Sequence, residues 1–371
     1  MRGARALLFC VAATAVGGAA ALPACGGGGF DPQSAVNSVR MFAARVDKPY
    51  ARPGETVNLE VLLTDGRADK TRPLKLYWIP IVCLNPRDDL YYLCFAPPSG
   101  DAGAGGSRFL PVGPLADAGV PEAGAGAGGG GSPLESIPTG IDIGPFLPQG
   151  PTFSFRMPED VIQPREGIED YGIAYVFNIA CAGQVRLAPP APGGGPQQVP
   201  LQCTDEDGRP LPPSDYVIGF ARVYSYANRT NTNPVIAEVT YAGQPVDLAK
   251  GITLPPCRGV RRRADCPEHK IDVRVTEESW EPNPSDVAAA AGAREQIWVT
   301  YYSDQGQFQD DARLLFDPRQ GRISESDVVY RAPADPAEGT IWAVVHDKRG
   351  GADWVVVPLH VRDDSPPPGA P

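Results

Sequence analysis

The stretch RPGETVNLEVLL, residues 52–63, decides the fold class of this chain. Residues 52–55 combine proline with glycine, which is typical of a turn. In residues 56–63 an apolar side chain stands at every second position: Val57, Leu59, Val61 and Leu63. A period of two places these side chains on one face of an extended strand. The stretch therefore predicts a turn followed by a half-buried β-strand.

Similar runs of apolar, β-branched and aromatic residues recur along the chain between breaker residues. They cover residues 38–46, 74–81, 152–157, 171–181, 216–226, 271–275, 295–302, 340–346 and 354–361. Gly and Pro number 42 each, well above ordinary usage. Many short strands joined by turns indicate an all-β protein. The last two runs flank DKRGG, residues 347–351, and predict a C-terminal hairpin in which Pro358 favours an edge strand.

Two groups of motifs resemble known immunoglobulin-like modules. PGETVNL at residues 53–59, followed by a strand that carries Trp78, resembles bacterial immunoglobulin-like domains. The C-terminal region is similar to a recurrent module of predicted myxobacterial-type envelope lipoproteins. The motifs that carry this second resemblance are EQIWVTYY (295–302), YRAP (330–333), TIWAVVH (340–346) and DKRGGADW (347–354). The resemblances imply β-sandwich domains, with Trp78 in the core of the first, and an envelope location. They imply no activity, because the function of that family is largely unknown.

The chain is longer than one sandwich usually is, and its composition suggests where modules begin and end. The expected parts are a signal peptide (1–24), a lipid-anchored flexible tether (25–37), a first immunoglobulin-like domain (38–230), a second (231–364) and a disordered tail (365–371). The first domain contains a Gly/Pro-rich insertion, residues 97–150, and a shorter one at 188–200. Because such segments hold few apolar side chains to offset the entropy of ordering, we expect the insertions to be disordered.

The N-terminus has the layout of a bacterial secretory signal. Arg2 and Arg5 precede an apolar stretch, residues 6–22, and Leu22-Pro23-Ala24-Cys25 follows. The last four residues resemble a lipobox, which implies lipidation of Cys25, palmitate among the attached chains, and a membrane anchor. We expect the outer membrane. Ordinary cleavage after Ala19-Ala20-Ala21 would instead leave a soluble secreted or periplasmic protein. No other segment approaches the roughly 20 apolar residues that a spanning helix needs.

The cysteines beyond Cys25 fall into local couples, and an exported chain permits disulfides. Proximity in the sequence is the ground for the expected pairing, although other connectivities exist. The pairs are Cys83 with Cys94, Cys181 with Cys203, and Cys257 with Cys266. Zinc is a competing interpretation of the last couple, with His269 as a third ligand, but a fourth ligand is missing.

Groups that could carry catalysis are sparse. The formal net charge is −11, which disfavours nucleic acid as a partner. His346 and His360 fall on neighbouring predicted strands and could face each other, yet ordinary strand residues are the better interpretation. The loop DEDG, residues 205–208, suggests calcium but lacks the remaining EF-hand ligands. Neither a nucleophile elbow nor a zinc-protease motif occurs, so we expect no enzyme, no cofactor and no metal.

One surface feature is unusual for so acidic a chain. Four arginines, Arg258, Arg261, Arg262 and Arg263, stand between Cys257 and Cys266. A disulfide-fixed basic finger of this kind could engage an anionic envelope glycan or an acidic protein partner. A merely solvated loop is the plainer alternative.

The sequence thus predicts a non-catalytic envelope lipoprotein that acts as a binding or structural module. Two alternatives stay open: a passive subunit of a larger envelope or secretion complex, and a secreted or periplasmic enzyme with an unrecognised site. A flat apolar patch would indicate the first, and a deep pocket lined by histidine and a carboxylate the second.

Overall fold

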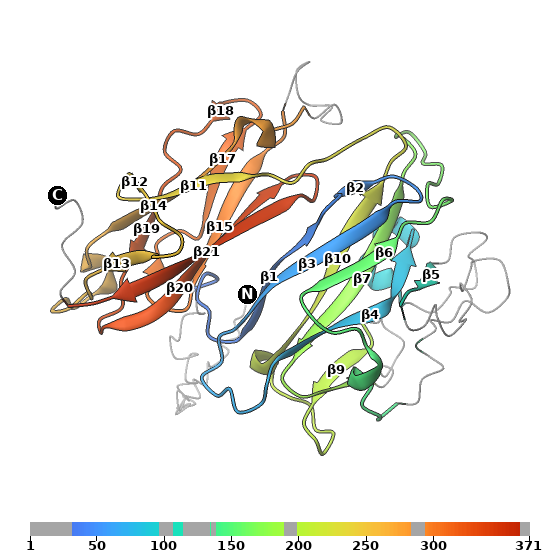
Figure 1. The fold of residues 1–371 in the computed structure, drawn as a ribbon, viewed down its shortest axis with the longest axis horizontal. Helices are drawn as coiled ribbons and strands as arrows, with labels where there is room; N and C mark the ends of the chain where they lie inside the picture. Colours follow the sequence, from blue (N-terminus) through green and yellow to red (C-terminus); the bar gives the residue numbers. More distant parts are fainter. Residues whose placement is uncertain are drawn as a thin grey trace, which may run out of the picture. The chain divides into compact units, whose positions relative to one another are not determined.

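A computed structural model describes residues 32–95, 107–113, 134, 139–188, 199–282 and 294–363. The predicted signal peptide, the lipidation site Cys25 and the tail from residue 365 lie outside the described residues, as do parts of both insertions. Contacts group Gln33–Pro371 into one compact unit. The described residues are β-strands, turns and short 3-10 helices (Figure 1), so the predicted all-β class is confirmed.

The N-terminal half of this unit contains three sheets. A three-stranded sheet has the order β1-β3-β6, and a five-stranded sheet the order β2-β10-β7-β4-β5. The bounds are β1 Val39–Val46, β2 Tyr50–Ala51, β3 Thr56–Asp65, β4 Lys75–Leu84, β5 Arg108–Pro111, β6 Thr152–Arg156, β7 Gly172–Cys181 and β10 Tyr216–Ser225. A small hairpin is formed by β8 (Gln184–Leu187) and β9 (Leu201–Thr204). The turn before β3 requires Gly54, whose φ of 78° is costly for other residues.

The C-terminal half contains two sheets. One has the order β12-β11-β14-β19-β16, and the other β13-β21-β20-β15-β17-β18. Their strands are β11 Ile236–Tyr241, β12 Gln244–Pro245, β13 Ile252–Leu254, β14 His269–Val275, β15 Ile297–Ser303, β16 Gln307–Phe308, β17 Ala312–Asp317, β18 Gly321–Arg322, β19 Val328–Arg331, β20 Ala337–Asp347 and β21 Ala352–Val361. Among the described residues, the 3-10 helices of the N-terminal half are η1 Arg87–Asp89, η2 Tyr91–Leu93, η4 Gly144–Phe146 and η5 Pro213–Asp215, and those of the C-terminal half are η6 Arg263–Asp265 and η7 Glu277–Ser279.

The two halves repeat one connectivity. In one sheet of each half, the first strand pairs with a later strand, and that strand pairs with one later still, giving β1-β3-β6 and β11-β14-β19. In the other sheet of each half, a short strand pairs in parallel with the last strand: β2 with β10, and β13 with β21. Each half is therefore an immunoglobulin-like sandwich of two facing sheets. We call them the first and the second sandwich.

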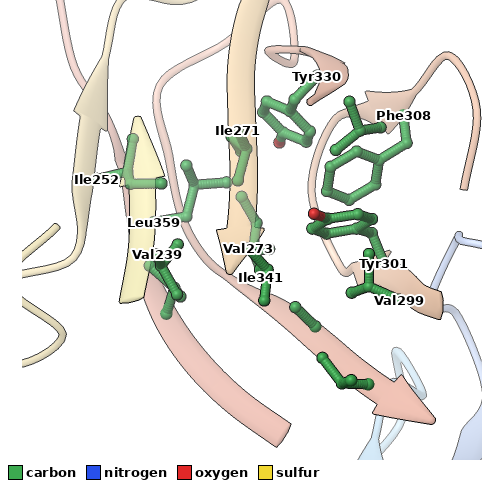
Figure 2. Close-up of a cluster of buried hydrophobic side chains, with 14 of the residues drawn as sticks. Val239, Ile252, Ile271, Val273, Val299, Tyr301, Phe308, Tyr330, Ile341 and Leu359 are labelled. Atoms are coloured by element: carbon green, nitrogen blue, oxygen red, sulfur yellow. The ribbon is translucent and has the colours of Figure 1, made fainter. Parts of the chain in front are cut away.

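Apolar side chains from the facing sheets fill both sandwiches. In the second sandwich they include Val239, Ile271, Val299, Tyr301, Tyr330 and Leu359 (Figure 2). In the first sandwich Trp78 is fully buried between the sheets, as predicted, and its ring stacks on Phe153 with 5.1 Å between centroids. Its indole N–H donates to the carbonyl of Gly150 at 2.9 Å, so its only polar group is satisfied.

The first sandwich also has a second apolar core, on the outer face of its larger sheet. Strand β7 is buried along its whole length, because Ile173, Tyr175, Phe177 and Ile179 face this outer core while the alternate residues face the inner one. Residues of the long insertion supply part of the cover: Phe109, Leu134, Ile143 and Leu147. The prediction of a disordered insertion is therefore wrong for its described residues, since these few apolar side chains are anchored against β7 and β5 pairs with β4.

The three disulfides link Cys83 to Cys94, Cys181 to Cys203 and Cys257 to Cys266, the pairing expected from proximity. Cys257 and Cys266 are thus engaged with each other and not with zinc. Among the described residues, no group of three or more His, Cys, Asp or Glu side chains could hold a metal ion. The described part of the chain also holds no helix of the length and hydrophobicity that crossing a membrane requires.

Two further expectations need correction. The end of the predicted flexible tether is fixed, because Ser303 donates its N–H to Ser34 at 2.9 Å and accepts that of Val36 at 3.0 Å. The terminal hairpin of β20 and β21 exists, but β21 is not an edge strand, since β13 covers its end. Pro358 is tolerated because β13 begins opposite Leu359, one residue further on.

Candidate functional site at the junction of the two sandwiches

The basic finger lies in the loop between β13 and β14, with its four arginines together as predicted. Two of the four are already paired with carboxylates: Arg258 with Asp363 at 2.6 Å, and Arg262 with Asp265 at 2.9 Å. Arg261 and Arg263 have no carboxylate within ion-pair distance among the described residues. The finger therefore offers less free positive charge than its sequence suggests.

The histidines do not form a site. His346 lies opposite Ala352 and stacks on Trp298, whereas His360 lies opposite Glu338 near the other end of the hairpin. The alternative in which they face each other is excluded, because the register places them far apart along β20 and β21. His269 is buried and shares a hydrogen bond with the hydroxyl of Tyr241.

The acidic loop at 205–208 closes on itself. The backbone carbonyl of Asp205 accepts the N–H of Gly208, and its side-chain carboxylate accepts the N–H of Arg209. The guanidinium of Arg209 lies 3.0 Å from the Asp207 carboxylate. This is a solvated turn with internal ion pairs.

The most elaborate polar arrangement is at the junction of the two sandwiches, built around a small apolar cluster. A β-bulge between Met41 and Ala43 turns the ring of Phe42 away from its own sandwich. That ring packs against Tyr302 and Trp342 of the second sandwich, with centroids 4.5 and 5.1 Å away. Val36, Ala43, Leu62, Val344 and Trp354 complete the cluster. The outer faces of β1 and β20 thus meet through apolar contact.

Arg45 of β1 extends this contact with charge. One nitrogen of its guanidinium lies 2.6 Å from Glu60 of the neighbouring strand, and the other lies 2.7 Å from Asp353 of the second sandwich. The guanidinium also lies over the ring of Trp354, 4.4 Å from its centroid. Because these groups are partly buried, their ion pairs are screened less than exposed ones.

A second charged group, Arg349, is held in the DKRGG turn between β20 and β21. Its guanidinium donates to both oxygens of Glu295 at 2.7 and 3.0 Å, and to Glu281 at 2.5 Å. Glu295 is fully buried. Burial raises the pKa of the Glu295 carboxyl, and the hydrogen bonds from Arg349 oppose the rise. Arg349 also lies 5.7 Å from the ring of Tyr50 in the first sandwich.

The segment that connects the sandwiches, residues 226–235, is fixed by its asparagines. The amide of Asn233 donates to the Val46 carbonyl at 2.7 Å and accepts the N–H of Ala352 at 3.0 Å, so one side chain bridges both sandwiches. Asn231 donates to the buried carboxylate of Asp347 at 3.0 Å. Burial raises the pKa of Asp347, while its hydrogen bonds lower it.

A cleft of about 760 Å³ opens beside these groups. Its lining consists of Arg45, Asp47, Asn58, Leu59, Glu60, Thr152, Phe153, Ser154, Asn233, Pro234, Val235 and Asp353. Three carboxylates face one guanidinium there, which disfavours an anionic ligand. Most of the charged groups are already paired with one another, and the lining holds neither histidine nor cysteine. The groups that line the cleft are therefore suited to hydrogen bonding and to holding the two sandwiches together.

None of the junction residues was singled out by the sequence. Arg349 lies in a motif that indicated a tight turn, and Asn231 and Asn233 lie in a segment that indicated a domain boundary. A weak signal existed, because two arginines, Arg40 and Arg45, stand in the largely apolar first strand, and Asn231 and Asn233 shortly precede Pro234.

Comparisons with known proteins name no family. No protein-family model and no curated protein matches the chain. Solved structures that align include dimeric latent PorU from Porphyromonas gingivalis (12% identity, 90% of this chain, 25% of that chain, TM-score 0.20). The D0-D1 domain of intimin aligns at 10% identity over 86% of this chain and 97% of its own, with a TM-score of 0.17. Escherichia coli alpha-2-macroglobulin activated by porcine elastase aligns at 9% identity over 90% of this chain and 22% of that one, with a TM-score of 0.20.

The chain spans about a quarter of the PorU structure it matches. With TM-scores this low, the likenesses bear on neither fold detail nor function.

Proposed function

We propose that this chain is a non-catalytic structural module of a bacterial cell envelope, in which two immunoglobulin-like sandwiches act as one unit. The observation that carries the proposal is the junction. Apolar packing of Phe42, ion pairs of Arg45 and the bridging amide of Asn233 join elements of both sandwiches. A freely hinged pair of domains would leave these groups in water.

The lack of a catalytic constellation among the described residues supports the non-catalytic part of the proposal. The junction cleft combines carboxylates with hydroxyls, but among the described residues no hydrogen bond joins the hydroxyl of Thr152 or Ser154 to a carboxylate. The histidines lie apart, and each is occupied by stacking or hydrogen bonding. An enzyme of the hydrolase type would need a nucleophile, a base and an orienting group together. The hydroxyls of Ser214 and Ser326 do hydrogen-bond to the carboxylates of Asp215 and Asp272, but among the described residues no histidine joins either pair.

The envelope location belongs to the same proposal and rests on the sequence of residues 22–25. Lipid on Cys25 would hold the unit at a membrane surface, with residues 26–31 between the anchor and the first fixed residues. Growth of the native bacterium with labelled palmitate tests this part. The wild-type protein should incorporate labelled palmitate, and the Cys25→Ser variant should not. Wild-type protein without label would contradict the lipid anchor.

Calorimetry of the full-length protein in detergent tests the structural part. Because the sandwiches share a junction, the two should unfold in one cooperative transition. Arg45→Met together with Asn233→Ala should split that transition into two, whereas Arg319→Met, an exposed arginine outside the junction, should leave it single. Two separate transitions in the wild type would overturn the proposal.

A further inference from the structure

The outer face of β10 carries aromatic side chains that remain exposed beside the second apolar core. Tyr91 and Phe220 stack with 4.2 Å between ring centroids and an interplanar angle of 23°. Tyr91, Tyr92 and Phe220 keep 39%, 36% and 38% of their surface exposed. Alternation along β10 places Phe220, Arg222 and Tyr224 on the same face, with successive side chains roughly 6.6 Å apart. We call Tyr91, Tyr92, Phe220, Arg222 and Tyr224 the aromatic stripe.

The loop that carries Tyr91 and Tyr92 is held rigidly. The Cys83–Cys94 disulfide closes it. The hydroxyl of Tyr175 donates to the Asp89 carbonyl at 2.6 Å, and the amide oxygen of Asn85 accepts the N–H of Ile173 at 2.9 Å. Little entropy of ordering the loop is therefore lost when its rings bind a ligand, which favours a binding surface.

The charge of the stripe points to the chemistry of the ligand. The neighbouring arginines are paired, Arg165 with Asp89 at 2.9 Å and Arg229 with Glu169. Arg222 is exposed and lies 4.9 Å from the centroid of the Tyr224 ring, and no carboxylate of the described residues lies within ion-pair distance of it. In a chain of net charge −11, this leaves an uncompensated guanidinium among stacked rings.

We propose that the aromatic stripe binds a linear polysaccharide that carries carboxylates. The C–H faces of sugar rings would pack against the exposed surfaces of Tyr91, Tyr92 and Phe220. The guanidinium of Arg222 would pair with a carboxylate through two parallel hydrogen bonds. An open row of rings along a strand suits an extended polymer. A protein partner is less well matched, because specific protein interfaces engage about 20–30 residues a side and the stripe is far smaller. This inference goes beyond the proposed structural role.

Isothermal titration of the full-length protein with oligogalacturonate, oligoalginate and a neutral cello-oligosaccharide of equal length tests the inference. At least one acidic oligomer should bind, and the neutral one should bind several-fold more weakly. Phe220→Ala should weaken acidic binding about fivefold to tenfold through lost stacking. Arg222→Gln should remove the preference for the acidic oligomer, together with the salt dependence of binding.

Arg319→Gln is the matched control and should leave binding unchanged. Arg222→Gln removes only an exposed side chain, so it keeps the test valid even if Phe220→Ala perturbs the second core. If neither acidic oligomer binds, or if Arg222→Gln binds both classes like the wild type, the inference is overturned. Neither result would affect the calorimetric test of the junction.

Discussion

Replacing Arg349 by methionine should destabilise the protein by about 3–5 kcal/mol, the usual cost of removing one partner of a buried ion pair. Arg349 donates to both oxygens of Glu295, whose side chain is fully buried. Methionine fills much of the same volume, so the cost comes from the stranded carboxylate and not from a cavity. Urea unfolding of the full-length protein, followed by tryptophan fluorescence, measures the change.

The penalty should depend on pH in a defined direction. The pKa of Glu295 is raised in the folded protein, and without Arg349 it should rise further. When a carboxyl has a higher pKa in the folded than in the unfolded protein, the protein loses stability as the pH rises from the unfolded-state pKa to the folded-state pKa. The reason is that the unfolded chain releases its proton at the lower pH. The deficit of Arg349→Met relative to the wild type should therefore be largest near pH 7 and should shrink toward about pH 5, close to the unfolded pKa of roughly 4.3.

Two controls separate the charge from the packing. Arg349→Met with Glu295→Leu removes the fully buried carboxylate and leaves only that of Glu281, whose side chain is 20% exposed. The stability of this double variant should return to within about 1 kcal/mol of the wild type. Arg319→Met, at an exposed position, should change neither stability nor its pH dependence. A deficit below about 1 kcal/mol at pH 7 for Arg349→Met, or one of equal size at pH 5, would refute the reasoning.

Further predictions concern the first sandwich. Trp78→Ala should cost at least about 3–5 kcal/mol, because the side chain is fully buried between the sheets, and a loss under about 1 kcal/mol in urea unfolding would contradict that core. Asn178→Leu should raise the midpoint of thermal unfolding, because the buried side-chain amide has no hydrogen-bond partner among the described residues. Leaving such a group unsatisfied costs about 1–3 kcal/mol, and a lower midpoint would show that the amide is satisfied. Replacing Cys181 and Cys203 together by alanine should cost about 3 kcal/mol, measured by the same unfolding, because the disulfide closes a loop with a sequence separation of 22; unchanged stability would count against it.

Local patterns sufficed for much of the fold. The alternation in residues 57–63 and the flanking turn predicted β3, and proximity predicted the disulfide pairing. The run GIAYVFNIAC, residues 172–181, is apolar on both faces, which is typical of a strand covered on both sides. The second cover of the sheet was nevertheless not predicted from this run. Because composition dominated the interpretation of the insertion, its few anchoring residues, such as Phe109 and Ile143, were missed.

The junction could not be predicted because its partners are remote in the sequence. Arg45 and Asp353 are 308 positions apart, and no periodicity links them. The alternative in which His346 and His360 face each other is excluded for a related reason. The two histidines do lie on neighbouring strands, but the register decides which residues meet, and it places His346 opposite Ala352. The disulfide that closes the basic finger was predicted correctly. The pairing of two of its arginines with Asp363 and Asp265 depends on loop geometry, which the sequence does not give.

The distance between spin labels on the two sandwiches tests the central claim most directly. Labels at Arg52→Cys in the first sandwich and Glu278→Cys in the second lie at exposed positions on either side of the junction. Double electron–electron resonance of the full-length, doubly labelled protein should give one narrow distance distribution. The distribution should broaden when Arg45→Met and Asn233→Ala are added. A broad distribution in the otherwise native protein would contradict the claim that the two sandwiches act as one unit.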